Sequence, residues 1–462
     1  MKPVVIIGGG IAGLTVAYKL KKKNIHVIVL EGKSHVGGAM YSSAEDGYIS
    51  EYGPNSIIET SPLVTELIEE LGLEKEKIYA NDKSQNRYIV RDGKPVSLPT
   101  SPPAFLKSSL FSLKSKLRLI KEPFISAWDN SYEESLSQFV LRRLGQEFLD
   151  YAINPFVAGV YAGDPDTLSV NHGFPKLYAL EQNYGSLIKG QIKGARERKA
   201  RAEESKHSAK MFSFSQGLKM FPECLSNILG QNVYLNSMVT NLTQNNDESW
   251  TITYSQNNNE NVVDAEAVIF AGRLVELANT LLDGQYKEEF KKLGTVYYPP
   301  VSTLALGFDR KNVEHPLDGF GVLIPKVEKK NILGTLFSSS LFPNRAPNGK
   351  VLLTNFIGGS RQPENANLET SELVKVVLKD LKDILGVSGE PEFVHHVYWK
   401  NAVPQYEVGY GTMKTMMDNL EIDYPGLFLT GNYRNGISAA DTIVSAIELS
   451  NRIPEFLNQT KG

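Results

Sequence analysis

The first thirty residues combine two short apolar runs with one stretch of helical periodicity. Val4 to Ile7 are four consecutive β-branched residues, as in a strand buried on both faces. Apolar residues then recur three and four positions apart between Leu14 and Leu20, and a second apolar run extends from His26 to Leu30. The pattern predicts a strand, a helix and a second, parallel strand in that order.

A glycine-rich turn joins the first predicted strand to the helix. In the arrangement Gly-x-Gly-x-x-Gly, the first glycine makes a tight turn, the second lets a pyrophosphate approach the backbone, and the third lets helix and strand pack closely. An acid, Glu31, ends the second strand, where a carboxylate can accept hydrogen bonds from both ribose hydroxyls; this argues against NADP. The predicted dinucleotide-binding residues are Gly8, Gly9, Gly10, Ile11, Ala12, Gly13, Glu31 and Gly32.

The middle of the chain contains strand signals with few helices between them. Runs at 87–91 and 95–98 flank Asp92-Gly93, which is a strong hairpin signal. Segments 303–308, 319–324, 333–337 and 351–357 alternate as strands. We therefore predict a largely antiparallel sheet, separate from the dinucleotide-binding unit.

The composition narrows the class of protein without identifying it. The chain has 462 residues, enough for about three domains, with a net charge of −3 and a single cysteine, Cys224. One cysteine excludes an intramolecular disulfide and dithiol redox chemistry, and no metal-binding or catalytic constellation is visible, so no metal is expected. No apolar run is long enough to span a membrane.

Two segments of the chain are basic. Residues 101–121 contain no acid and have apolar residues at roughly helical spacing. They predict either a helix that lies on a membrane surface or a helix that packs on its own core with a solvated basic face. Residues 189–210 are interpreted as a mobile surface loop, with contact to anionic lipid as the alternative. Residues 189–210 have no interleaved aromatic residues of the kind that bind nucleic acid, and no nucleic-acid partner is expected.

A second glycine pair identifies the dinucleotide by resemblance. Gly37-Gly38, followed by Ser42, is similar to the second glycine signature of the glutathione-reductase-type FAD enzymes, in their amine-oxidase branch. His35 and Ala39 stand where that signature has arginines, which puts one contact with the flavin nucleotide in question. The resemblance implies FAD as the cofactor.

The C-terminal region resembles a further FAD-binding element of these enzymes. A short strand at 427–429 is followed by a turn and by a helix that Ser438 caps, with Asp441 at the third helical position. Both ends of the chain are therefore expected to build one domain. The expected fold is α/β plus α+β: a discontinuous Rossmann-type FAD domain (1–75, 211–295 and 415–462), a substrate domain with a largely antiparallel sheet (76–100 and 296–414), and a helical, membrane-associating insertion (101–210).

Nearly the whole chain resembles the oxygen-dependent protoporphyrinogen oxidases of haem biosynthesis. The resemblance implies that six hydrogens leave the porphyrinogen in three two-electron steps through the flavin, and that three O2 become three H2O2. No side-chain base is then required, because a pyrrole N–H can lose its proton as the meso C–H bond breaks. The segments that carry the resemblance are Asn86–Gly93, Pro155–Pro165, Phe174–Leu177, Gly319–Pro325, Gly334–Ser339, Phe342–Pro347 and Gly431–Gly436.

The same resemblance implies roles for individual residues. Arg87 matches an arginine that pairs with a substrate propionate, as a guanidinium fork suits a carboxylate. Leu323, Leu336 and Phe356 match residues that sandwich the macrocycle, and Gly159 matches a backbone position that lines the pocket. Further residues expected to contact the cofactor are Gly37, Gly38, Gly53, Pro54, Asn55, Ser56, Val239, Asn432, Ile437, Ser438 and Ala439; further partners for propionates are Arg345, Arg361 and Arg434.

Several alternatives stay open at this point. Protoporphyrinogen IX is the expected substrate, coproporphyrinogen III is the alternative, and a non-catalytic carrier on the same fold is the alternative from a different class. The expected partners are the porphyrinogen, O2 and an anionic membrane surface, with a homodimer left open. The expected location is the cytoplasm, peripherally attached to the cytoplasmic membrane.

Overall fold

A five-stranded parallel sheet brings together segments from the whole length of the chain. The computed structural model describes residues 2–84, 86–129, 131–200, 209–279, 281–282 and 287–459. The predicted strand–helix–strand unit is confirmed, because α1 (Ile11–Lys22) joins the two parallel strands β1 and β2. In the order of the sheet, the strands are β10 (Val233–Tyr234), β2 (Val27–Leu30), β1 (Val4–Ile7), β14 (Ala267–Phe270) and β21 (Leu427–Leu429).

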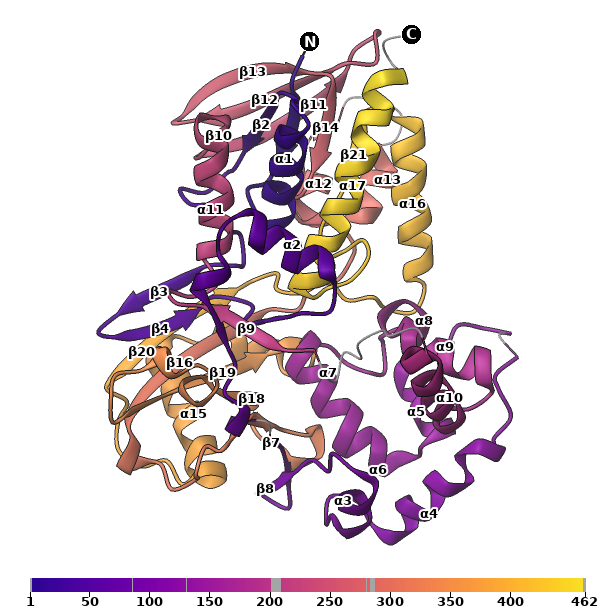
Figure 1. Ribbon diagram of the computed structural model, residues 1–462, viewed down its shortest axis with the longest axis vertical. Coiled ribbons are helices and arrows are strands. Elements are labelled where there is room, and N and C mark those ends of the chain that lie inside the picture. Colours follow the sequence, from indigo (N-terminus) through magenta and orange to yellow (C-terminus); the bar gives the residue numbers. More distant parts are fainter. Residues whose placement is uncertain are drawn as a thin grey trace.

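Each face of this sheet is covered by its own layer (Figure 1). Val4 and Ile6 point into a core with α1, α2 (Pro62–Glu70), α11 (Met220–Leu229) and α17 (Ala439–Gln459), whereas Val5 and Ile7 point into a second core. The alternation is the period of two expected of a strand. The second core contains strands β11 (Ser237–Gln244), β12 (Trp250–Gln256) and β13 (Asn259–Ala265), and helices α12 (Leu274–Asn279), α13 (Lys287–Leu293) and α16 (Tyr410–Asp423). The short strand β15 (Leu281–Leu282) pairs with β11.

The second large sheet has seven strands and is largely antiparallel, as predicted. Only the β17–β7 pair is parallel. One of its faces packs on α15 (Thr370–Leu385). The predicted hairpin is present, with Asp92 (φ 53°) and Gly93 (φ 75°) at its turn. The strand order is β20 (Phe393–Trp399), β16 (Val301–Asp309), β19 (Lys350–Gly358), β18 (Ile332–Phe337), β17 (Gly319–Leu323), β7 (Asn86–Arg91) and β8 (Lys94–Ser97).

Smaller strands connect the two large sheets. β3 (Ser42–Glu45) and β4 (Tyr48–Glu51) form a hairpin, and β5 (Ile57–Ile58), β9 (Met211–Phe214) and β6 (Lys77–Tyr79) form a three-stranded sheet. The short helix α14 (Ser338–Leu341) follows β18. The expected domain boundary at 415 falls inside α16, whose Tyr410 and Met417 both lie in the second core of the parallel sheet.

Residues 101–200 are mainly helical and lie at the lower end of the molecule in Figure 1. A buried ion-pair network fixes their packing, because the Arg143 guanidinium contacts the carboxylates of both Glu122 and Glu181 and all three residues are fully buried. The helices are α3 (Pro102–Lys107), α4 (Leu113–Lys121), α5 (Leu136–Arg143), α6 (Gln146–Phe148), α7 (Asn154–Tyr161), α8 (Val170–Gly173), α9 (Pro175–Tyr184) and α10 (Leu187–Ala200), with a π-helical turn (Leu149–Ile153) before α7.

The structure corrects two expectations for the basic segments. Residues 101–121 form two helices rather than one, because the chain breaks between α3 and α4 to bury Leu110 and Phe111. Residues 189–200 continue α10 rather than a loop, since Lys, Arg, Ala and Glu are all good helix formers. The remainder of that predicted loop, 201–208, lies outside the described residues. In the ranges that the structure covers, none of the helices has the length and apolar character needed to cross a membrane.

Candidate functional site

The glycine turn after β1 has the shape that a bound dinucleotide requires. Gly8 adopts φ +108°, and a Cβ atom on Gly13 would overlap the carbonyl oxygen of Gly8. A Cβ on Gly10, in contrast, would meet nothing within 4 Å. Because α1 begins here without a side-chain cap, the N–H groups of its first turn are free for an anion. The backbone beside Gly10 is therefore open to a pyrophosphate.

The Glu31 carboxylate is held in place at the end of β2. Gly9 N–H donates to Oε2 (2.6 Å) and Lys33 N–H donates to Oε1 (2.8 Å), and Glu31 is only 9% exposed. A carboxylate offers about four lone-pair positions, so two remain for ribose hydroxyls. Close by, a Cβ on Gly32 would collide with the Met238 side chain, so Met238 packs on the backbone that directly follows Glu31.

The second glycine pair lies directly against the first glycine turn. Gly37 N–H donates to the Gly9 carbonyl (2.8 Å), and a Cβ on Gly38 would touch Gly10 Cα. Neither of the two residues that replace arginines carries a guanidinium: the His35 ring packs beside Tyr41, with the ring centres 4.3 Å apart, and Ala39 packs against Gly53. The two glycine signatures thus share one cradle, and its anion-binding capacity comes from backbone N–H groups.

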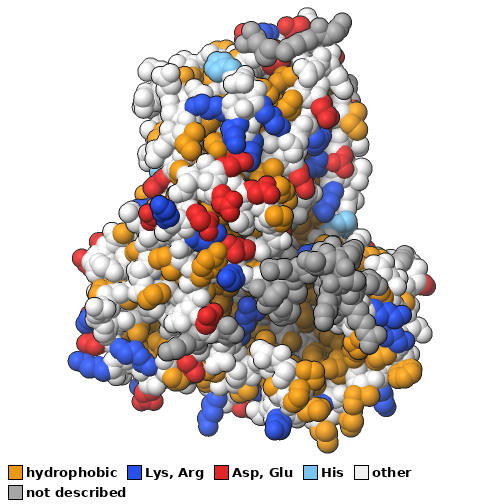
Figure 2. Space-filling view, viewed as in Figure 1, with side chains coloured by type: hydrophobic (Ala, Val, Ile, Leu, Met, Phe, Trp, Pro, Cys, Tyr) orange, Lys and Arg blue, Asp and Glu red, His pale blue; other side chains and the backbone are white. Residues whose placement is uncertain are grey.

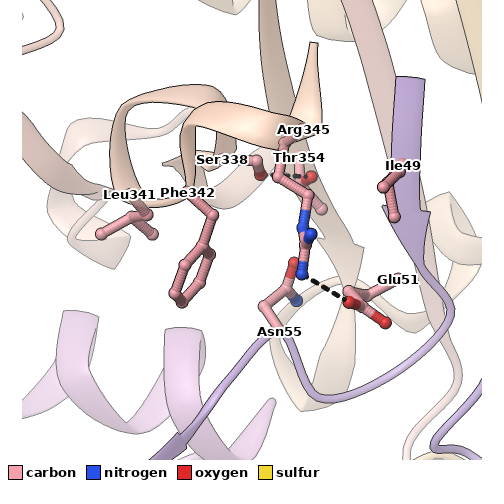
Figure 3. Close-up of a pocket in the computed structure, with 8 residues that line it drawn as sticks. All are labelled: Ile49, Glu51, Asn55, Ser338, Leu341, Phe342, Arg345 and Thr354. Carbon is pink, nitrogen blue, oxygen red and sulfur yellow. Dashed lines mark hydrogen bonds and ion pairs between the residues drawn. The ribbon is translucent and has the colours of Figure 1, made fainter. Parts of the chain in front are cut away.

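The turn from Gly53 to Ser56 borders a small cavity (Figure 3). Asn55 lines this cavity opposite Arg345, and its Nδ2 donates to the Gly53 carbonyl (3.1 Å). Arg345 Nη2 lies 3.1 Å from Glu51 Oε1, and both side chains are buried. Burial raises the pKa of the Glu51 carboxyl and lowers the pKa of the Arg345 guanidinium.

Two of the arginines expected to bind additional propionates form ion pairs with carboxylates of the protein itself. Arg345 donates to Glu51 and to Ser213 Oγ (2.5 Å) in the buried network just described. Arg434 Nη2 pairs with Asp418 (2.8 Å) and Glu421 (3.3 Å) of α16. Both expectations are therefore corrected, because these charges are already neutralised by carboxylates of the chain itself.

The C-terminal segment reaches the same edge of the parallel sheet. Ser438 caps α17 as predicted, with Asp441 N–H donating to Ser438 Oγ (3.1 Å). Two stacked tyrosines hold the preceding loop: Tyr406 O–H donates to the carbonyl of Asn432 (2.6 Å), and Tyr410 O–H donates to that of Tyr433 (2.5 Å). Ile437 and Ala439, at the start of the helix, pack on the two cores of this sheet.

The expected substrate residues share one face of the seven-stranded sheet. Side chains of directly paired residues lie on the same face of a sheet, and the pairs Arg87–Gly321, Gly321–Leu336, Leu323–Gly334 and Gly334–Phe356 connect all four expected side chains. The opposite face carries Val322, Leu353 and Ile357, which pack on α15. This grouping was not evident from the sequence, because it depends on the register of four strands.

Helix α7 covers part of this face. Ala158 of this helix and Ala162, which directly follows it, pack with Phe356, and a Cβ on Gly159 would overlap the Leu323 side chain. Arg87 is exposed at the rim, with its guanidinium 5.5 Å from the centre of the Phe320 ring. The arrangement offers an apolar surface with one cation at its edge.

The apolar face and the cofactor edge are linked through the end of α7. Gln405 Nε2 donates to the Tyr161 carbonyl (2.9 Å), and the adjacent Tyr406 holds Asn432. Burial, together with the charge of Asp441 in the first turn of α17, raises the pKa of Tyr161 to about 12. Gln405 and Tyr406 lie in no sequence motif, and Tyr161 lies in the Pro155–Pro165 segment, where no role is predicted for it.

Comparisons with known proteins agree with this geometry. The family of flavin-containing amine oxidoreductases matches residues 11–454. Protoporphyrinogen oxidase 2 (chloroplastic/mitochondrial) of Arabidopsis thaliana is 38% identical, covering 99% of this chain and 94% of its own. Coproporphyrinogen III oxidase of Bacillus subtilis is 30% identical, covering 96% of each chain. A crystal structure from Exiguobacterium sp. 255-15 has a TM-score of 0.82 at 22% identity over 98% of both chains.

The family match and the match to the Arabidopsis thaliana relative both extend over nearly the full length of the chain. They establish an oxidoreductase with FAD as its cofactor. The chain therefore belongs to the flavin-containing amine oxidoreductases, with protoporphyrinogen and coproporphyrinogen III oxidases among its relatives.

Proposed function

We propose that this protein oxidises protoporphyrinogen IX to protoporphyrin IX in haem biosynthesis, with three O2 reduced to three H2O2. The observation that carries the proposal is the shared sheet face, on which Arg87 stands at the rim of an apolar surface built by Leu323, Leu336 and Phe356. A porphyrinogen has the matching chemistry, because it is an apolar macrocycle with carboxylates at its edge. The full-length relatives support the same reading.

Each residue has a separate task in this reaction. Arg87 orients the macrocycle by pairing with a propionate. The apolar side chains exclude water from the ring, and the absence of a side chain at Gly159 makes room for the Leu323 side chain itself. When bound, FAD supplies the two-electron oxidation, and the chain supplies position and a dry environment. A pyrrole N–H releases the proton, so no side-chain base is needed.

Coproporphyrinogen III is the second candidate substrate. It differs from protoporphyrinogen IX in carrying four propionates instead of two, and the Bacillus subtilis relative carries the name of this activity. Among the described residues, Arg361 forms hydrogen bonds to the Ile324 carbonyl and Asn154 Oδ1 and no ion pair, so a second cation is present near the apolar face.

Anaerobic mixing of the purified flavoprotein with each porphyrinogen tests the proposal. We expect bleaching of the flavin absorbance with at least one substrate, and a higher kcat/KM for protoporphyrinogen IX in air. A higher kcat/KM for coproporphyrinogen III would select the second candidate. If the protein binds flavin but neither porphyrinogen bleaches the flavin absorbance, both candidate substrates are refuted. That result would favour the hypothesis of a non-catalytic carrier.

We further propose that the protein attaches peripherally to the cytoplasmic membrane through α3 and α4. Figure 2 shows hydrophobic side chains gathered at the lower end of the molecule, beside Lys and Arg. Neither helix buries a residue, and the exposed apolar side chains are Leu106, Leu113, Leu117, Ile120 and Phe124. An apolar surface flanked by lysines suits the interface of an anionic bilayer, and flotation with anionic vesicles tests it.

A further inference from the structure

Arg361 is a cation that no carboxylate neutralises directly. Within the described parts of the chain its guanidinium makes no ion pair, in contrast to Arg345 and Arg434. Asp164 is the carboxylate that acts on it electrostatically, but Asp164 lies 3.6 Å from Lys326 Nζ. Burial lowers the pKa of Arg361 to about 10, so the guanidinium is still charged at neutral pH.

The position of Arg361 ties it to the apolar face. Its Nη1 donates to the Ile324 carbonyl (2.8 Å), immediately after Leu323. Its Nη2 donates to Asn154 Oδ1 (3.0 Å) at the start of α7, the helix that carries Gly159. These two bonds use two of the five N–H donors of a guanidinium, which leaves three for another acceptor.

Arg361 and Arg87 lie at separate points along β17. Arg87 pairs with Gly321, whereas Arg361 binds the carbonyl of Ile324. Three residues of strand correspond to about 10 Å. Two cations thus lie at separate points near the strand that carries Leu323, and the propionates on two pyrroles of one macrocycle are likewise separated along its edge.

We propose that Arg361 binds a second propionate of the porphyrinogen. This inference rests on the proposed function and applies to both candidate substrates, since each carries at least two propionates. It makes Arg361 a second carboxylate-binding residue beside Arg87: a substrate with two propionates gains a second charge-assisted hydrogen bond.

Steady-state kinetics of Arg361→Met and Arg361→Lys with three substrates test the proposal. The substrates are protoporphyrinogen IX, coproporphyrinogen III and the dimethyl ester of protoporphyrinogen IX, which has no carboxylate, presented in detergent micelles. We expect Arg361→Met to raise KM by about tenfold or more for whichever of the two porphyrinogens with free carboxylates the enzyme oxidises, with little change in kcat. The KM for the ester should not change. Arg361→Lys should recover part of the loss.

Arg310→Met is the matched control, because Arg310 also donates only to backbone carbonyls, those of Val313 and His315. It should leave KM unchanged. An equal loss on the ester would show that Arg361 only supports the fold, and unchanged KM for the free acids would also overturn the proposal. Failure of the wild-type protein to oxidise any of the three substrates would instead refute the proposed function.

Discussion

The Leu323 side chain occupies the space that a side chain at position 159 would need. A Cβ on Gly159 would overlap Leu323 Cδ2, so α7 and β17 approach each other as closely as they do only because residue 159 is glycine. Because Leu323 can rotate, Gly159→Ala should displace Leu323 toward the substrate rather than unfold the protein. We expect a severalfold higher KM for the porphyrinogen with a nearly unchanged Tm.

The double variant Gly159→Ala/Leu323→Ala separates the two effects. Removing the Leu323 methyl groups makes room for the new Cβ, so the two substitutions should be non-additive in KM, as expected for residues in contact. Additive changes would contradict the assigned contact.

Glu31 should determine the affinity for FAD. In Glu31→Gln an amide NH2 replaces one of the oxygens that accept N–H from Gly9 and Lys33, and the charge that holds the ribose is lost. Hydrogen bonds to charged groups contribute about 1.5–3 kcal/mol, so we expect Kd for FAD to rise about 10- to 100-fold. Titration of the apoprotein with FAD, followed by flavin fluorescence, measures this. Glu45→Gln, at an exposed position of β3, is the control and should not change Kd.

Arg345 should matter for stability rather than for substrate binding. Arg345→Met leaves the buried Glu51 carboxylate without its partner, and breaking a buried pair in this way costs about 3–5 kcal/mol. Adding Glu51→Gln should restore part of the free energy of unfolding, measured by urea denaturation. Arg452→Met removes an exposed pair with Glu421 and should cost about 1 kcal/mol or less. An Arg345→Met protein as stable as the wild type would contradict the buried network.

Sequence patterns predicted those parts of the fold that neighbouring residues determine. The unit from Val4 to Glu31 could be predicted because strand, glycine turn and helix each leave a local signature, and the hairpin at Asp92-Gly93 follows from turn chemistry alone. The stretch 189–200 is helical although its charge density predicts a loop, because its residues have high helix propensity.

The candidate site was only partly predictable, because its decisive contacts join distant segments. Glu51 and Arg345 are 294 residues apart and pair only after two sheets have packed. The ion pair between Arg434 and Asp418 likewise depends on tertiary packing, as does the position of Arg361, which forms no ion pair with any described residue. A family resemblance can suggest which arginines lie near a substrate. Only the fold shows which of these arginines already form ion pairs with carboxylates of the same chain.

Acidification should loosen the start of α4 through Glu147. Burial alone would raise the pKa of this carboxyl, but hydrogen bonds from Ser115 and Ser112 and the ion pair with Arg91 lower it to about 2. The folded state therefore holds the proton less tightly than the unfolded chain, whose pKa is 4.5. The stabilisation is complete above pH 4.5 and is lost as the pH falls from 4.5 toward 2.

Glu147→Gln removes this dependence. We expect the Tm of the wild type to fall more steeply between pH 5 and pH 3 than that of Glu147→Gln. Glu248→Gln, at an exposed position, should retain the wild-type slope. Parallel curves for the wild type and Glu147→Gln would contradict the assigned role.

Membrane attachment should depend on the exposed face of α4. Leu113, Leu117 and Ile120 recur at helical spacing and are 72%, 52% and 64% exposed, while Lys114 and Lys121 stand beside them. We expect the wild-type protein to float with phosphatidylglycerol vesicles, more strongly at low than at high salt, because salt screens the lysines but not the apolar contact. Leu117→Asp/Ile120→Asp should abolish flotation.

The matched control for this surface is Ile422→Asp. Ile422 lies on α16, away from α3 and α4, and is also 72% exposed. This variant adds a charge at an equally exposed apolar position, so it should float like the wild type if attachment is local to α4. Equal loss of flotation in both variants would indicate a general effect of the added charge. A wild-type protein that stays unbound at both salt concentrations would refute the attachment, because an apolar patch flanked by lysines should bind an anionic bilayer best when salt is low.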